Sequence, residues 1–155
     1  MRKNLLASLV ALLIGGAAAI LPAAAIASPG DSIGLTGRTS WFAELNDALA
    51  RMNDFGVPIH NGCNGAEKLC VHVDHYRKAD RLSGYFQGDR VWVNDQYDNG
   101  MYLRRVSLWM HELGHAAGLD HSDNCDSSMY HTFPACGSYF LGYNAHEQQQ
   151  IREKW

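Results

Sequence analysis

The sequence predicts a single small α+β domain, and three observations support this prediction. Apolar residues recur at helical spacing in residues 40–55 and 101–117, whereas residues 71–76 and 90–94 alternate with the period of two typical of a strand. No internal repeat, low-complexity tract or linker divides the chain. Its 155 residues suit one domain with one hydrophobic core. We therefore expect helices packed around one sheet.

The domain is expected to begin irregularly and then to form a helix. Residues 28–39 are rich in glycine and serine, so they predict at most a short strand at 33–35. Residues 40–55 carry an apolar stripe at helical spacing, made of Trp41, Leu45, Ala48, Leu49 and Met52. Such a stripe belongs in the core of the domain.

Two strands and a second helix follow. A polar loop at 62–68 precedes the strand at 71–76, and a turn at 94–100 follows the strand at 90–94. The next helix, from about Met101 to Ala117, has a predicted buried stripe of Leu103, Val106, Met110, Leu113 and Ala117.

A last helix is predicted at the end of the chain. Asn144, with Glu147 three residues later, has the spacing of a capping box, which marks a helix start. The apolar side chains of Ile151 and Trp155 would hold this helix against the core.

Residues 1–27 predict a Sec-type export signal. Residues 2–3 are basic, residues 5–20 are almost entirely apolar, and residues 25–27 form a small-x-small cleavage site. Two glycines and a proline interrupt the apolar stretch, and no basic stop-transfer group follows, which disfavours a membrane anchor. We therefore expect residues 28–155 to be secreted as the mature domain.

The charge of the mature chain disfavours nucleic acid and membranes as partners. Loss of Arg2 and Lys3 with the signal lowers the formal charge from −3 to about −5, and no basic run remains. Binding to phosphate needs clustered lysine and arginine. We expect a monomer with no nucleic-acid partner and no stable membrane association.

The four cysteines predict disulfides in the exported part. Cys63, Cys70, Cys125 and Cys136 are an even set in an oxidising compartment, with three possible connectivities. We favour the local pairs Cys63–Cys70 and Cys125–Cys136, because each closes a short segment rich in small polar residues. No CxxC spacing supports a cysteine metal site.

The strongest local signal is the segment from residue 111 to residue 121. His111 and His115 are four residues apart, so they lie on one face of a helix and can bind one metal ion, with Glu112 between them. Gly118 can adopt the left-handed conformation that ends a helix, which lets His121 return to the metal. Three protein ligands leave a fourth zinc position for water, as in catalytic sites.

This HExxHxxGxxH pattern resembles the metzincin clan of zinc endopeptidases at every defined position. Met129, eight residues past His121, is similar to the methionine of the clan's Met-turn. Residues 117–122 and the Met129-Tyr130 pair resemble matrixins, whereas the layout of residues 84–155 resembles the small bacterial snapalysins. Snapalysins carry aspartate as the third ligand, and this chain has His121 there.

The resemblance implies a metzincin-like catalytic domain over residues 28–155, with a twisted mixed sheet. It implies one catalytic zinc held by His111, His115 and His121, with Glu112 as general base and then general acid. Met129 would form an apolar floor under the imidazoles.

The resemblance also implies a polypeptide substrate bound in extended form along the cleft edge of the sheet. We assign this edge to the strand at 90–94, so that Val91, Trp92 and Val93 would contact the substrate. Residues 133–143 are rich in Phe, Tyr, Gly and Leu, which predicts an apolar pocket for the residue after the cut.

Two other functions stay open. A zinc amidase acting on cell-wall peptide or another non-protein amide would use the same metal, water and Glu112. A non-catalytic zinc-binding secreted module would not need Glu112 beside an open metal position, so the sequence argues against it.

Two further groups of polar residues invite a metal interpretation. His72 and Asp74 share one face of a strand while His75 lies on the other, so ordinary polar strand positions are the better explanation. Asp95 and Asp98 lie in a turn without a regular calcium pattern, so calcium is unsupported.

Overall fold

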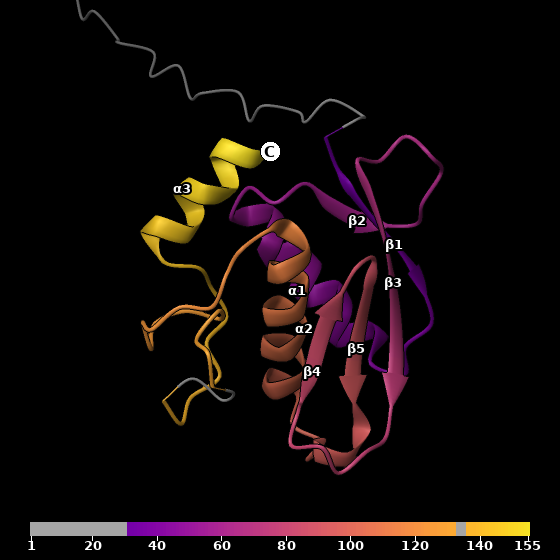
Figure 1. Cartoon of the computed structure of the whole chain (residues 1–155), viewed down its shortest axis with the longest axis vertical. Helices are drawn as coiled ribbons and strands as arrows, with labels where there is room; N and C mark the ends of the chain where they lie inside the picture. Colours follow the sequence, from indigo (N-terminus) through magenta and orange to yellow (C-terminus); the bar gives the residue numbers. More distant parts are fainter. Residues whose placement is uncertain (1–30, 133–135) are drawn as a thin grey trace, which may run out of the picture.

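The computed structural model describes residues 31–132 and 136–155 (Figure 1). The predicted export signal, residues 1–27, lies outside the described residues. The described part contains three α-helices and one five-stranded mixed sheet, which confirms the predicted α+β class. No helix in this part is long and apolar enough to cross a membrane.

The sheet has the strand order β2-β1-β3-β5-β4. Its strands are β1 (Ile33–Gly37), β2 (Ile59–Asn61), β3 (Leu69–Tyr76), β4 (Gly84–Gln87) and β5 (Arg90–Asn94). Strands β2, β1, β3 and β5 run parallel to one another. β4 pairs antiparallel with β5 and forms the edge of the sheet. The short strand predicted at 33–35 is longer than expected and lies inside the sheet, between β2 and β3.

The assignment of residues 90–94 to the cleft edge was wrong. β5 is paired on both sides, with β3 and with β4, so its backbone cannot accept a peptide strand. Val91 and Val93 are fully buried, and Trp92 lies on the opposite face. Substrate contact by Val91, Trp92 and Val93 is therefore withdrawn. The edge is β4, which folds back on β5 through Gly88, a residue with φ of +66°.

Two helices cover one face of the sheet. Figure 1 shows α1 (Phe42–Asp54) and α2 (Tyr102–Ala117) side by side against it. The strands direct a row of fully or almost fully buried side chains toward them: Ile33, Leu35, Val71, Val73, Val91 and Val93. The predicted stripe of α2 is buried except for Leu103, which lies in the first turn of the helix and is 48% exposed.

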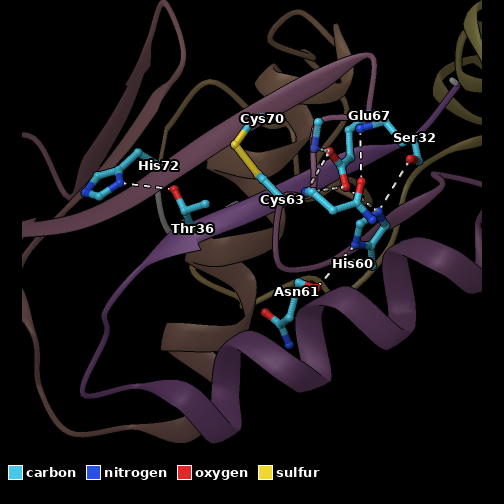
Figure 2. The surroundings of a disulfide bond; sticks show 11 residues. Ser32, Thr36, His60, Asn61, Cys63, Glu67, Cys70 and His72 are labelled. Atoms are coloured by element: carbon cyan, nitrogen blue, oxygen red, sulfur yellow. Dashed lines mark hydrogen bonds and ion pairs between the residues drawn. A yellow bond between two sulfur atoms is a disulfide. The ribbon is translucent and has the colours of Figure 1, made fainter. Parts of the chain in front are cut away.

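The other face of the sheet carries the disulfide Cys63–Cys70, as predicted (Figure 2). A Cβ atom at Gly34 would lie 2.9 Å from both the Cys63 Sγ and the Glu67 Cγ. The loop can therefore lie directly on β1 only because residue 34 has no side chain. The Glu67 carboxylate accepts a hydrogen bond from the backbone N–H of Asn64, which lowers the pKa of this carboxyl.

The last helix, α3 (Ala145–Lys154), begins at the predicted capping box. Asn144 accepts a hydrogen bond from the backbone N–H of Glu147, whose carboxylate accepts one from the backbone N–H of Asn144. Ile151 is fully buried, and the Trp155 Nε1–H donates to the Ala117 carbonyl at 2.9 Å. The C-terminal segment is thus fastened to the end of α2.

Candidate metal centre

Helix α2 and the turn after it bring three imidazoles together. His111 and His115 lie one turn apart on α2, and Gly118, with φ of +92°, ends the helix. The backbone N–H of Leu119 donates to the Gly114 carbonyl at 3.0 Å, which reverses the chain so that His121 returns. One ring nitrogen from each of the three histidines lies within 4.8 Å of the other two.

Backbone carbonyls fix which ring nitrogen of each helical histidine faces the centre. The Nδ1 of His111 lies 2.7 Å from the Ser128 carbonyl, and that of His115 lies 2.9 Å from the Leu119 carbonyl. A carbonyl oxygen only accepts, so both Nδ1 atoms carry the proton and both Nε2 atoms keep a lone pair. Such a second hydrogen bond is the usual way to orient a metal-binding histidine.

The donor set fits zinc. The Nε2 atoms of His115 and His121 are 3.2 Å apart. Tetrahedral zinc with Zn–N bonds of about 2.0–2.1 Å separates two nitrogen ligands by roughly 3.3 Å. Burial lowers the pKa of His111 to about 4 and also lowers that of His115, which keeps both rings neutral, the form that binds metal. In residues 31–132 and 136–155, no other group of three such side chains converges.

Glu112 places a buried carboxyl beside this centre. The residue is 3% exposed, and burial raises its pKa to about 8. A bound cation would oppose that shift, because it favours the ionised form. A Cβ atom at Gly84 of β4 would lie 2.7 Å from the Glu112 Oε1 and 2.8 Å from the Trp92 carbonyl oxygen. The edge strand therefore reaches the carboxyl only because residue 84 is glycine.

Met129 packs under α2 next to the histidines. It is fully buried, and a Cβ atom at Gly114 would overlap its Sδ. The Met129 carbonyl accepts a hydrogen bond from the backbone N–H of Ser122 at 2.7 Å, just after His121. The segment that contains Met129 is thus joined both to the helix of the first two histidines and to the loop of the third.

A buried hydrogen bond and a disulfide hold the segment of Met129 in place. The Ser127 hydroxyl donates to the Glu147 carboxylate of α3 at 2.7 Å and accepts from the Met129 backbone N–H at 2.8 Å. The disulfide Cys125–Cys136 closes around this segment, as predicted. Since Ser128 supplies the carbonyl that orients His111, the anchoring extends to the metal centre.

A cleft of about 670 Å³ opens over the site. Its lining comes from β4 and the loop before it on one side and from the metal centre on the other. The lining residues are Arg81–Phe86, Leu108, His111, Glu112, His115, Gly118–His121, His131 and Thr132. Phe133, with which the predicted apolar pocket begins, lies outside the described residues. His131 is exposed on the cleft rim, 3.4 Å from the Asp123 carboxylate.

The other polar groups considered as metal sites have protein partners. The His75 ring bonds the Thr39 hydroxyl at 2.6 Å and the Asp95 carboxylate at 2.7 Å. The Asp98 carboxylate pairs with the Arg105 guanidinium at 2.6 Å. These contacts agree with the interpretation of the strand and turn residues as ordinary polar positions.

Comparison with known proteins agrees with this geometry. The sequence model of the matrixin family matches residues 60–153, which include the whole metal centre. The chain belongs to the matrixin family. It is therefore a zinc metallopeptidase of metzincin type, as the motif predicted. No curated protein sequence matches this matrixin significantly.

Solved structures show the same fold at low sequence identity. The archaemetzincin of Methanopyrus kandleri is similar with a TM-score of 0.58 and 14% identity, over 81% of this matrixin and 96% of that chain. A zinc-dependent peptidase of Methanocorpusculum labreanum gives a TM-score of 0.55 and 15% identity, over 77% and 100% of the two chains.

Several contributors to the site have no clear signature in the sequence. The carbonyls of Ser128 and Leu119 orient histidines through the backbone, so no residue type could reveal them. Gly114 did carry a signal, because a glycine inside a helix costs about 1 kcal/mol and suggests close packing. Gly84 carries no such signal, because its close approach to Glu112 depends on the tertiary fold.

Proposed function

We propose that this matrixin is a secreted endopeptidase in which His111, His115 and His121 hold zinc and Glu112 carries the proton. One observation supports this most strongly. Three ring nitrogens converge, two of them oriented through carbonyls, directly beside a buried carboxyl at an open cleft. With histidine as the third ligand, the set matches the matrixin pattern and not a pattern that has aspartate at this position.

Glu112 acts as the proton carrier in this proposal. Zinc, when bound, supplies a Lewis acid that polarises the scissile carbonyl and lowers the pKa of an attacking water toward about 7. Glu112 accepts the proton of that water and then delivers it to the leaving amine. Burial raises the pKa of this carboxyl to about 8, and a bound cation opposes that shift, so the ionised form can accept the proton and the protonated form can return it.

The free edge of β4 holds the polypeptide in extended form. β5 occupies one side of β4, and within the described residues no strand occupies the other, which borders the cleft. An added peptide strand can pair with such an edge through main-chain hydrogen bonds, preferably antiparallel. Gly84 then lies opposite the bond to be cut, since it contacts the Glu112 carboxyl.

Export is part of the proposal. Residues 1–27 have the composition of a Sec-type signal, and two disulfides suit an oxidising compartment. The test is mass analysis of the protein in the medium and in cells. A mature chain starting near Ser28 in the medium is expected, and an uncleaved cell-associated chain would contradict export.

Hydrolysis by the purified mature protein tests the catalytic proposal. We expect cleavage of casein within the chain, loss of cleavage with a zinc chelator, and its return after zinc is added back. Purified cell-wall peptide should be assayed in parallel. Hydrolysis of cell-wall amides without cleavage of casein would favour the amidase instead.

A further inference from the structure

The loop between β3 and β4 forms one wall of the cleft, and a buried asparagine is hydrogen-bonded to it. Asn94 is 1% exposed, and its side-chain amide donates to the Lys78 carbonyl at 2.7 Å and to the Leu82 carbonyl at 2.9 Å. Its side-chain oxygen accepts from the Lys78 backbone N–H. The same amide also bonds the Asp80 carboxylate at 3.2 Å. The conformation of the loop is therefore stabilised by hydrogen bonds to a buried side chain.

Arg81 lies in this loop in a conformation that few residues other than glycine adopt. Its φ is +69°, in the left-handed region. The Tyr97 hydroxyl accepts a hydrogen bond from the Arg81 backbone N–H at 2.8 Å, which helps to hold that conformation. A left-handed residue inside an otherwise fixed loop often has a functional reason.

Arg81 lines the cleft, and its guanidinium has no carboxylate partner among the described residues. The carboxylate of the neighbouring Asp80 bonds the Asn94 amide and the Leu82 backbone N–H, and it forms no ion pair with Arg81 among the described residues. A cation fixed on a cleft wall favours an anionic group in the ligand.

We propose that Arg81 is a specificity residue that selects an acidic side chain two or three residues after the cleaved bond. This inference rests on the proposed endopeptidase function. With Gly84 opposite the scissile bond and the peptide antiparallel to β4, the substrate residues after the cut run toward the loop before β4, in which Arg81 lies three residues before Gly84. An extended chain advances about 3.3 Å per residue, which brings the second or third of them to Arg81.

The test compares cleavage of one parent peptide with variants carrying Asp, Gln or Lys at the second or third position after the cut. We expect the wild type to have a kcat/KM about two- to fivefold higher for Asp than for Lys at one of these positions, the range of a solvent-exposed ion pair. Arg81→Glu should reverse that order. Arg152→Glu makes the same charge change on the exposed surface of α3 and should keep the wild-type order.

The outcomes separate the two proposals. Cleavage by the wild type without an acidic preference, or the same order in Arg81→Glu as in Arg152→Glu, would overturn the role of Arg81 and leave the endopeptidase proposal intact. Lack of cleavage of every peptide would overturn the proposed function and this inference with it. The Gln peptide reports cleavage without charge, so a fall common to all peptides in Arg81→Glu identifies loop damage and overturns the proposed specificity role.

Discussion

At the scale of single residues, the site depends on close packing that is possible only where certain positions are glycine. Gly84 and Gly114 make room for the Glu112 carboxyl and for Met129. The three histidines were predictable because their spacing in sequence follows helix geometry and a glycine stop. Their hydrogen-bond partners were not, because backbone carbonyls of distant segments carry no signature in the sequence.

Replacing His121 and Asp120 one at a time shows which of these two neighbouring residues is the third zinc ligand. His121→Ala is expected to weaken zinc retention strongly, since two imidazoles from one helix bind the ion less well than three. Asp120→Ala should keep about one zinc per chain, because Asp120 is not in the converging group. Metal analysis after dialysis against a weak chelator provides the measurement. The opposite pattern would show that the turn at Gly118 presents a different residue.

Gly114→Ala should destabilise the protein by about 1–3 kcal/mol through overpacking. The new methyl group would overlap the Met129 Sδ and lie 3.3 Å from the Tyr143 hydroxyl oxygen. Denaturant unfolding measures the loss. A second substitution, Met129→Ala, provides the control because it makes room for the methyl group. If the two losses simply add in the double variant, the contact is not the cause.

At the scale of elements, the helices and the long strands followed from periodicity, and the edge strand did not. α2 begins within one residue of the predicted start, and α3 begins at the predicted capping box. β4 has only four residues, so the alternation of apolar and polar residues along it is too short to identify a strand from the sequence. The order of strands in the sheet is a tertiary property, which is why the cleft edge was assigned to β5.

The two disulfides should differ in their effect on activity. The paired cysteines are separated by 7 and by 11 positions in the sequence, which predicts a similar loss of unfolding free energy when either disulfide is removed, about 2–3 kcal/mol each. Replacing Cys125 and Cys136 by serine should also lower kcat/KM, because that loop contains Met129 and Ser128. Replacing Cys63 and Cys70 should not, because that disulfide lies on the opposite face of the sheet. Equal activity in the two double variants would contradict the bracing of the metal centre.

At the scale of the whole molecule, charged side chains tie the two core helices to the turn before α2. Arg105 of α2 bonds Glu44 of α1 at 2.9 Å and Asp98 at 2.6 Å, and its guanidinium lies 4.9 Å from the Trp41 ring centre. The hydrogen bond from Arg105 holds the pKa of Asp98 below its ordinary value. This pair therefore stabilises the fold only while Asp98 is ionised.

Asp98→Asn should lower the free energy of unfolding by about 1 kcal/mol at neutral pH. Because the folded pKa of Asp98 is depressed, its contribution is complete above the unfolded pKa of about 3.9 and disappears as the pH falls through the folded value. The gap between wild type and variant should therefore close below about pH 4. Unfolding curves at several pH values measure it, with Asp89→Asn as an exposed control. A gap that does not depend on pH would exclude the ionised pair as its source.

The most direct test of the central claim pairs zinc content with peptide hydrolysis in Glu112→Gln. This change keeps the volume of the buried side chain and all three histidines, but removes the group that accepts and returns the proton. We expect about one zinc per chain, as in the wild type, with a loss of kcat of at least about a hundredfold. Full activity with zinc bound would contradict the role of Glu112, and loss of zinc would place Glu112 among the ligands.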